Sequence, residues 1–568
     1  MLLNVQNKQR GYDMKNKEQK DIIETLFIFI VFTTISILVG IINTSINYDI
    51  IWCFHMIQKV ANGYMLYSEI NTVVTPIFFW IGSLFIKLFG NSLVSFAIYG
   101  GVIWGVLTTT LYKIVKKIMI KENRFAIILF MIIAIQLTPS FFLANYNITA
   151  AMWIFIALLI EIKNCDEKKK INDYLIGIFL ALAFFTKQNI GTFGVLATGA
   201  ISLINELVVN KKNPIKEIIR KATGFLSMLA IFCGYFVLTN TFNDFMLFCF
   251  GGLVEFGSNN FSISLSGNTF IMLVIAMISG FYIKESKNKD KKILVLFIYY
   301  LLMCLIMFPL MNAYHTLLSM LFMIPVVIYL LNLITIEKKV YNLFVAVIGL
   351  LWFSAQYLFE SSVMSDTELF FNSATEMSNL FFILLIICNL LLLITTVLSI
   401  CVSGIKSDKN MNIKTPMYFI ITICLVSCIV ITKINLDNSK DIETPGIGIY
   451  KSHGYEEEKI TYIKDVIEYI LEKEKEGYKV YVVSADASYY MAELNRNQYK
   501  YDMVLYGSLG HNGEDTLIEE TSKLNDAIIL KDKNLMWQEP KKFDQYIKEN
   551  YKAIDEIRNL IVYIQNDK

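Results

Sequence analysis

The sequence predicts an α-helical membrane protein that crosses the bilayer many times and ends in a small α/β domain. Hydrophobic residues make up 55% of the 568 residues, and a mean hydropathy of +0.51 is typical of polytopic membrane proteins. Apolar runs follow one another as far as residue 433. Beyond that point the pattern changes to short strands alternating with amphipathic helices, which is typical of a soluble domain.

A helix needs roughly 20 mainly apolar residues to cross the hydrocarbon core of a bilayer. About 13 segments of the chain meet or approach this requirement: 22–43, 92–113, 125–142, 148–163, 173–186, 192–209, 222–240, 269–284, 293–310, 316–334, 341–359, 379–403 and 416–433. Segment 76–89 is apolar but short, so we expect it to lie along the membrane interface.

The distribution of basic residues indicates the orientation of the chain. If the N-terminus is cytoplasmic, the cytoplasmic segments hold about 29 Lys and Arg, whereas the outer loops before the last span hold about three. An odd number of spans then places the C-terminal domain outside the cytoplasm. We therefore expect a multi-pass protein of the plasma membrane, with a cytoplasmic N-terminal segment (1–21), a membrane domain (22–434), a linker (435–450) and an extracytoplasmic α/β domain (451–568).

The last part of the chain predicts a small parallel sheet covered by helices. Helices are expected at 456–476, 487–494, 514–524 and 543–550, and strands at 480–484, 503–506, 527–530 and 560–564. From residue 440 onward the net charge is roughly −7, so the membrane domain carries the positive balance.

Charge and cysteine usage argue against several functions. Ionisable residues are nearly absent from the middle of the predicted spans, whereas transporters and proton pumps usually carry them there. The nine cysteines show neither a metal-ligand spacing nor a disulfide framework. The lysine-rich cytoplasmic segments are explained by topology, so no nucleic-acid partner is expected.

Two outer loops are long, 44–91 and 241–268, and the first contains an ordered set of polar and glycine positions. Asp49 precedes a short amphipathic helix, and the loop continues through Gly63, Tyr67-Ser68-Glu69, Pro76 and Leu88-Phe89-Gly90. An acidic side chain is thereby placed where the chain leaves the bilayer.

This order resembles the catalytic loop of polytopic GT-C glycosyltransferases, in particular the bacterial protein-mannosyltransferase and aminoarabinose-transferase-like (GT39/GT83-like) branch. Members usually show an Asp, a G-x-x-x-Y-x-D-like turn, a Pro and then Leu-Phe-Gly; here Glu69 replaces the second Asp and position 75 is Thr. Two further places at the outer ends of spans also resemble the family: Phe185-Thr186-Lys187-Gln188-Asn189, and Tyr314-His315 before Pro325. The resemblance covers roughly residues 22–335.

The resemblance implies an inverting glycosyltransferase that moves a sugar from a polyprenyl-phosphate or diphosphate donor to a cell-envelope acceptor on the outer face. The acceptor is a glycan, a glycopolymer or a protein, and membrane lipid is a further partner. Asp49 is the expected base, because the acceptor hydroxyl must lose a proton as it attacks. Lys187 and His315 are expected to bind the departing phosphate.

Each candidate residue also has a structural interpretation. Asp49 is a possible helix cap, Glu69 a possible turn cap, and Lys187 a possible interface anchor. His55 lies on the polar face of the amphipathic helix, where a solvated side chain is common. Possible acceptor-side or auxiliary groups are His55, Tyr67, Glu69, Asp244 and Glu255.

Two other functions compete with glycosyl transfer. A flippase or transporter of lipid-linked sugars would show charges in midspan or a repeated half, and the sequence shows neither. A non-catalytic scaffold that displays the α/β domain would leave the named polar groups apart in space. No metal-ligating residues are predicted and no cofactor is certain, although a lone Asp49 neither requires nor excludes a divalent metal ion.

Overall fold

The structure is a computed structural model. It describes residues 2–42, 48–119, 130, 134, 143–209, 211, 213–259, 262–263, 272, 275–276, 279–280, 283, 291–307, 310–311, 313–335, 444–445, 448–450, 454–455, 457–484, 486–498, 501, 504–505, 508–510, 512–524, 527–534 and 540–566. The predicted spans 341–359, 379–403 and 416–433 lie outside these residues, as do most of 125–142, 269–284 and the linker.

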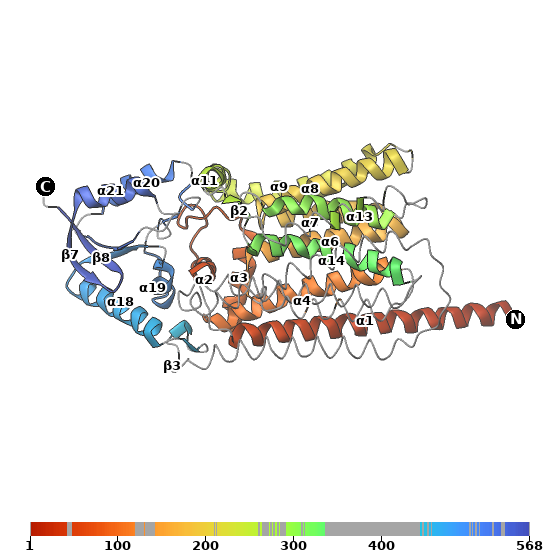
Figure 1. The fold of residues 1–568 in the computed structure, drawn as a ribbon, viewed down its shortest axis with the longest axis horizontal. Coiled ribbons are helices and arrows are strands. Elements are labelled where there is room, and N and C mark those ends of the chain that lie inside the picture. The colour runs from red at the N-terminus through yellow and green to blue at the C-terminus, as the bar shows by residue number, and fades with distance from the viewer. Residues whose placement is uncertain are drawn as a thin grey trace, which may run out of the picture.

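Long helices packed side by side form the larger part of the molecule (Figure 1). They are α1 (Leu2–Ile42), α4 (Leu93–Ile118), α6 (Tyr146–Asp166), α7 (Lys170–Phe184), α8 (Gln188–Leu203), α9 (Ile215–Leu238), α13 (Lys291–Met303) and α14 (Ala313–Thr335). Within the described residues, five stretches are long and apolar enough to cross a membrane: Gln19–Ile41, Leu93–Ile118, Tyr146–Asp166, Gln188–Leu207 and Ile215–Leu238. The structure therefore supports a polytopic helical protein, while the count of about 13 spans stays a prediction.

Glycine allows neighbouring helices of the bundle to approach closely. On α7, a Cβ at Gly177 would lie 2.0 Å from the Lys221 carbonyl oxygen of α9. On α9, a Cβ at Gly224 would lie 2.1 Å from the Tyr174 carbonyl oxygen of α7. Because backbone atoms cannot move aside as a flexible side chain can, both positions require glycine for this packing.

Two short helices run across one end of the bundle instead of along it. In Figure 1, α2 (Tyr48–Ala61) is seen end-on and α3 (Ile77–Phe89) stands upright beside the horizontal long helices. Because α3 runs across the bundle, its direction agrees with the expectation that segment 76–89 lies along the membrane interface. Pro76 precedes α3 and Gly90, with φ of +93°, ends it.

The second long loop, which follows α9, lies at the same end of the bundle. It contains α10 (Phe242–Met246), the π-helical turn η2 (Leu247–Gly251) and α11 (Gly252–Asn259). Shortly after α11, β1 (Ser262–Ile263) pairs in parallel with β2 (Leu310–Met311). Both long loops and the chain entering α14 therefore meet at one end of the helices.

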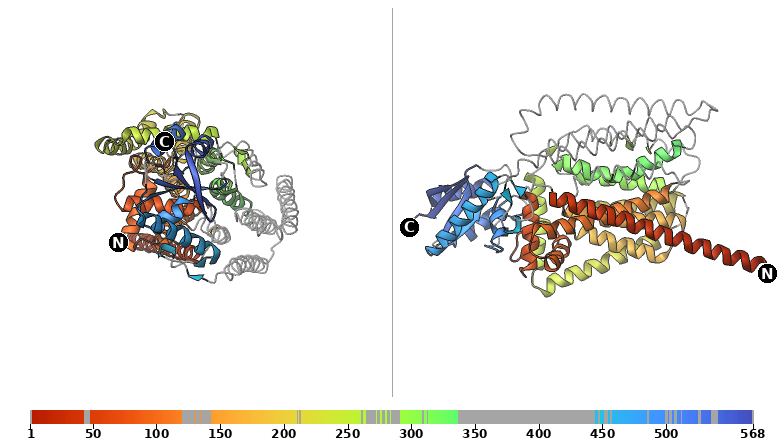
Figure 2. Two further views of the ribbon diagram at one scale, coloured as in Figure 1. Left: turned by 90° about the vertical axis from the view of Figure 1, so that its left-hand side faces the viewer. Right: turned by 90° about the horizontal axis from the view of Figure 1, so that it is seen from below.

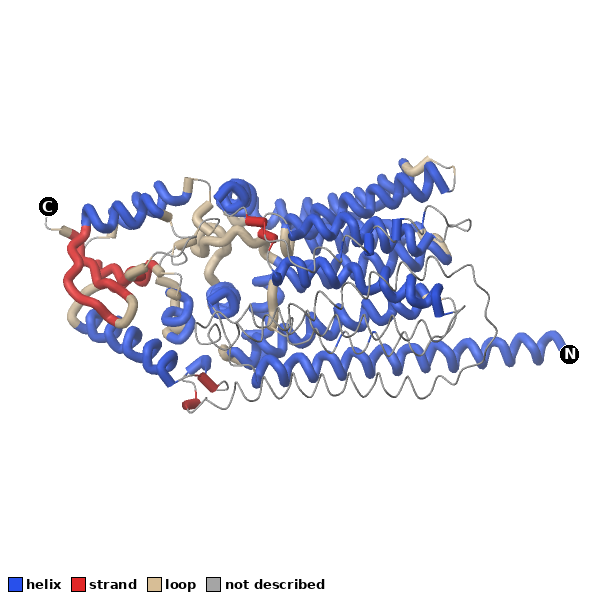
Figure 3. Tube along the Cα trace, in the orientation of Figure 1, coloured by secondary structure: helices blue, strands red, loops and turns tan. Residues whose placement is uncertain are grey.

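The C-terminal domain is a mixed α/β structure. Its main part is preceded by one short antiparallel pair, β3 (Thr444–Pro445) and β4 (Gly454–Tyr455), and by the 3-10 turn η5 (Gly448–Tyr450). The main elements are α18 (Glu457–Lys475), β5 (Lys479–Val483), α19 (Ala487–Glu493), α20 (Gly513–Ser522), β6 (Ala527–Asp532), α21 (Lys541–Asn550), β7 (Tyr551–Ile557) and β8 (Leu560–Gln565). Figure 3 shows that the larger strands are confined to this domain.

The prediction of a parallel sheet is wrong. The strand order is β5-β6-β8-β7, and only the β5–β6 pair is parallel among these four strands. A two-residue turn at Arg558 and Asn559 joins β7 to β8 as a hairpin, which forces antiparallel pairing at that side of the sheet. The strand expected at 503–506 is also wrong where it can be judged, because Val504 and Leu505 belong to no strand.

The C-terminal domain lies at the end of the bundle occupied by α2 and α3, away from the N-terminus of α1 (Figures 1 and 2). Its helix α19 packs directly on α2. The domain that ends the chain is therefore in contact with the loop that follows the first helix.

Candidate active site

Asp49 lies in the first turn of α2 and is exposed. Its charge acts on Cys53, one turn further along the helix, and on Lys187 from the corner between α7 and α8. A carboxylate in the first turn of a helix is stabilised by the positive end of the helix dipole. This position is compatible both with a structural role in the helix and with access to a substrate.

The α7–α8 corner presents Lys187 at the loop end of the bundle. Helix α7 ends at Phe184, Lys187 is the N-cap residue of α8, and its backbone N–H donates to the Ala183 carbonyl at 2.8 Å. A Cβ at Gly191 would lie 2.3 Å from the Phe184 Cα, so the tightness of the corner depends on that glycine. The lysine is therefore held on a short, rigid turn.

The Lys187 side chain is half-buried and rests on an aromatic ring. Its Nζ lies 4.6 Å from the centre of the Tyr146 ring, within the range of a cation–π contact. Burial lowers the pKa of Lys187 to about 8, although nearby Cys53 and Asp49 act in the opposite direction. Within the part of the chain that the structure describes, Lys187 makes no salt bridge, so an anionic ligand would relieve its desolvation.

His315 completes this group from the first turn of α14, where it is partly buried. The charge of Lys187 acts on His315 as well as on Asp49. Lys187 is thus the common neighbour of the other two residues, and three of the predicted site residues come from three distant parts of the chain. Their catalytic and binding roles remain predictions.

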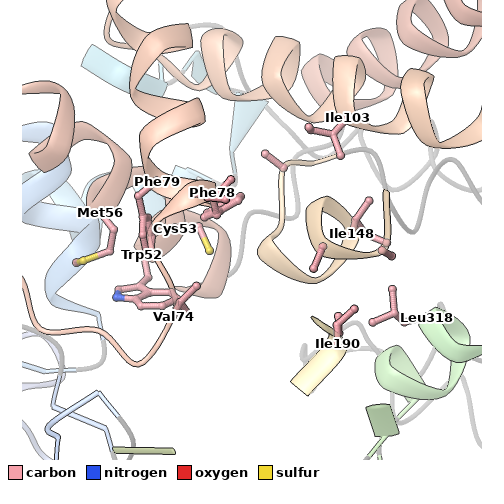
Figure 4. Close-up of a cluster of buried hydrophobic side chains, with 14 of the residues drawn as sticks. Trp52, Cys53, Met56, Val74, Phe78, Phe79, Ile103, Ile148, Ile190 and Leu318 are labelled. Carbon is pink, nitrogen blue, oxygen red and sulfur yellow. The ribbon is translucent and has the colours of Figure 1, made fainter. Parts of the chain in front are cut away.

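An aromatic wall supports this group. The Tyr146 ring meets Trp52 edge-on at 6.3 Å and Phe78 at 5.9 Å, and Trp52 meets Phe79 at 6.4 Å. Figure 4 shows Trp52, Phe78 and Phe79 gathered between α2 and α3, with Ile190 of α8 beyond them. A low-dielectric wall of this kind strengthens the interaction of Lys187 with any anion beside it.

His55 has a different environment from the solvated one expected. It is fully buried, and its Nε2 lies 3.1 Å from the Arg496 carbonyl oxygen in the C-terminal domain. Because a carbonyl oxygen can only accept, Nε2 carries the hydrogen and Nδ1 is unprotonated. Burial, reinforced by the charge of Lys59, holds the pKa of His55 well below its ordinary value of 6.5.

We expect this histidine to make domain docking sensitive to acid. Separation of the domains would expose His55, whose usual pKa is 6.5, whereas the docked form remains neutral. Docking is therefore strongest above pH 6.5 and weakens as the pH falls below it, by up to about tenfold per unit. The thermal midpoint of wild type should fall more steeply between pH 7 and pH 5 than that of His55→Gln, whose amide retains a donor and does not titrate. Equal slopes would contradict this explanation.

Tyr67 and Glu69 shape the turn between α2 and α3. Tyr67 is fully buried with φ of +72°, and its hydroxyl donates to the Val74 carbonyl at 3.0 Å. Glu69 is exposed, and its carboxylate accepts from the Met65 N–H at 2.7 Å. These contacts fix the path of the loop between α2 and α3.

The two acidic residues of the second loop face the C-terminal domain. The Glu255 carboxylate accepts from the Asn512 N–H at 2.5 Å. Asp244, in the first turn of α10, acts electrostatically on Tyr501 of the C-terminal domain. Both residues therefore lie where the second loop and the domain meet.

A buried network of charges lies at the opposite end of the helices and was not expected. Lys221 Nζ lies 2.5 Å from Glu161 and 2.7 Å from Glu217, and it donates to Ser202 at 2.9 Å. Lys168 joins Glu217 to Glu206. These residues occupy helix ends and not midspan, so the observation does not favour transport. A surface hollow bordered by Leu207 and Pro214 is also at that end, away from Asp49.

A family model described as dolichyl-phosphate-mannose-protein mannosyltransferase matches residues 73–236. The crystal structure of ArnT from Cupriavidus metallidurans bound to undecaprenyl phosphate is similar, with a TM-score of 0.57, 12% identity and coverage of 95% of this chain and 97% of that one. The chain has the GT-C fold. Apo ArnT from the same organism matches the GT-C fold of this chain with a TM-score of 0.53, 11% identity and the same coverage.

No curated protein sequence matches this chain. The family match includes Lys187 and begins after Asp49, so the GT-C resemblance of the Asp49 loop depends on the fold and on the motif order. The structure adds Gln188 and Tyr146 to the residues around Lys187. Gln188 belongs to the motif from Phe185 to Asn189 that carries the GT-C resemblance, whereas no sequence signal marked Tyr146.

Proposed function

We propose that this protein is an inverting glycosyltransferase that moves a sugar from a polyprenyl-phosphate or diphosphate carrier to a cell-envelope acceptor on the outer face of the membrane. The observation that carries the proposal is the convergence of Asp49, Lys187 and His315 at the loop end of the bundle. The GT-C fold and the family match support the reaction class. The undecaprenyl phosphate bound to similar ArnT supports the carrier class.

In the proposed reaction the acceptor oxygen attacks C1 of the sugar while the bond from C1 to the phosphate oxygen breaks. The phosphate leaves with the electron pair and needs no proton, but its charge must be stabilised. Lys187 supplies a partly desolvated positive charge beside the apolar wall, and His315 supplies a hydrogen-bond donor. Asp49 takes the proton of the acceptor hydroxyl. A single displacement of this kind inverts the configuration at C1.

The proposal is tested first by binding. Undecaprenyl phosphate is the probe, with the full-length protein in detergent or nanodiscs at pH 7.5. Lys187→Met should weaken its affinity by about tenfold to a hundredfold, because a charge-assisted contact in a water-poor site is lost. Lys87→Met is the matched control, since Lys87 is an exposed lysine near the end of α3. Equal affinities for the two variants would remove Lys187 from the site and overturn the proposed function.

The pH dependence of binding provides a separate prediction. With the pKa of Lys187 at about 8, the free protein carries the cation below pH 8 and loses it above. Affinity for undecaprenyl phosphate should be flat from pH 7 to 8 and then fall by up to about tenfold per pH unit. Lys187→Arg should abolish the break near pH 8, because guanidinium stays charged throughout this range. A break retained in the Arg variant would assign it to another group.

A further inference from the structure

The side chain of Gln188, next to Lys187, connects both outer loops. Gln188 is buried, and its Nε2 donates to the Val73 carbonyl at 2.8 Å and to the Cys249 carbonyl at 2.9 Å. Val73 belongs to the loop between α2 and α3, and Cys249 to the π-helical turn η2. Both hydrogens of one amide are therefore used to hold two segments that are far apart in the chain.

The same corner is attached to the first loop at two further points. The Thr75 hydroxyl donates to the Phe184 carbonyl at 3.0 Å, and the Ile77 N–H donates to the Phe185 carbonyl at 2.9 Å. Together with the bond from Gln188 to Val73, these two bonds fix the position of the α7–α8 corner relative to the start of α3. The bond to Cys249 adds the second loop at its π-helical turn, an element that is frequent at functional sites.

Few side chains can replace Gln188 in this arrangement. A planar NH2 group offers two hydrogens at a fixed angle, which suits two carbonyl acceptors. Glutamate has the same shape but offers acceptors only, so it would face both carbonyls with like partial charge. Methionine fills the space but leaves two buried carbonyls without this donor, and such groups are costly to bury.

We propose that Gln188 is a positioning residue that holds the donor-binding Lys187 against both outer loops, so that the second loop and the lipid-phosphate site move as one unit. This inference rests on the proposed function, because it assigns Lys187 to the donor phosphate. Gln188 does not touch the reacting atoms; it acts through the corner. A change on the side of the second loop, where Asp244 and Glu255 meet the C-terminal domain, is therefore transmitted to the donor site.

The pH profile of binding separates positioning from simple support of the fold. When Gln188 no longer closes the corner, water reaches Lys187 and its pKa moves from about 8 back toward the ordinary value of 10.5. In Gln188→Met and Gln188→Asn, the break in undecaprenyl phosphate affinity should move upward by at least about one pH unit. Affinity at pH 7.5 should fall by about tenfold in Gln188→Met and by less in Gln188→Asn, whose shorter amide reaches one carbonyl.

Gln545→Met provides the matched control, because Gln545 is exposed on α21 and bonds Glu549 of the same helix. It should leave affinity and pH break unchanged. If the two Gln188 variants are folded and keep the wild-type break, with affinity within twofold, the positioning inference is overturned while the proposed function stands. If Gln188→Met does not fold, the Gln188→Asn profile decides alone. If Lys187→Met binds the probe as tightly as wild type, the proposed function itself fails.

Discussion

Asp49→Asn is expected to reduce glycosyl transfer by about 10²- to 10⁴-fold, the usual contribution of a positioned general base. Asparagine has the shape of aspartate and keeps a polar group in the first turn of α2, but it cannot accept the acceptor's proton. Helix α2 and its packing on α19 should therefore persist, and the affinity for undecaprenyl phosphate should change little. The measurement is the initial rate of transfer from a polyprenyl-phosphate-linked sugar by protein in liposomes.

The matched control for this variant is Asp515→Asn. Asp515 also lies in the first turn of a helix, α20, but its side chain is exposed on the C-terminal domain and makes a long ion pair of 3.5 Å with Lys542. Transfer should be unaffected there. If Asp49→Asn retains a third or more of the wild-type rate, Asp49 is not the base, and its role reduces to stabilising the helix terminus.

Lys221→Met is expected to produce the largest loss of stability, about 3–5 kcal/mol, because it leaves Glu161 buried without a cation and leaves Glu217 with Lys168 alone. The side chains of Lys221, Glu161 and Glu217 are 6%, 5% and 9% exposed, so solvent cannot replace the lost charge. The network joins α6 to α9 at the end remote from the candidate active site. Thermal unfolding of the purified protein in detergent or nanodiscs measures the effect.

Two comparisons make the Lys221 result specific. Lys117→Met removes a lysine that is 45% exposed and pairs with Asp166 at 3.6 Å, and it should cost no more than about 1 kcal/mol. Lys221→Met combined with Glu161→Gln and Glu217→Gln should recover much of the loss, because no uncompensated buried charge remains. A triple variant as unstable as the single one would show that packing, and not charge, dominates at this position.

Local patterns predicted the helical architecture well. Helix α18 ends two residues before Gly477, whose φ of +97° requires glycine at that stop. The amphipathic run after Asp49 forms α2, and the brief apolar run before Gly90 forms α3 across the bundle. These elements are specified by apolar spacing and terminal residues within each segment, so they can be predicted without knowing which distant segments pack against them.

The errors have a common physical origin in contacts between distant segments. Strand β7 was missed because Lys552 to Glu556 are all exposed, so an edge strand shows no alternation of apolar residues. Without β7, the strand ending the chain was taken as parallel. His55 was expected in solvent because the sequence of its helix does not show that the C-terminal domain covers it. Its partner Arg496 lies 441 residues further along the chain. The charge network joins four chain segments, and spacing within one segment does not reveal it.

The attachment of the C-terminal domain has a consequence for how such chains diverge. Side chains of the membrane part donate to the carbonyls of Ala492, Arg496 and Ser508, and Glu255 accepts from the N–H of Asn512. Every residue supplies a backbone carbonyl, and every residue except proline supplies a backbone N–H. Evolutionary drift at those four sites can therefore leave these four bonds intact, whereas the bonds that the side chains of Asn495 and Asn497 make to Asn62 and Glu69 depend on the residues present.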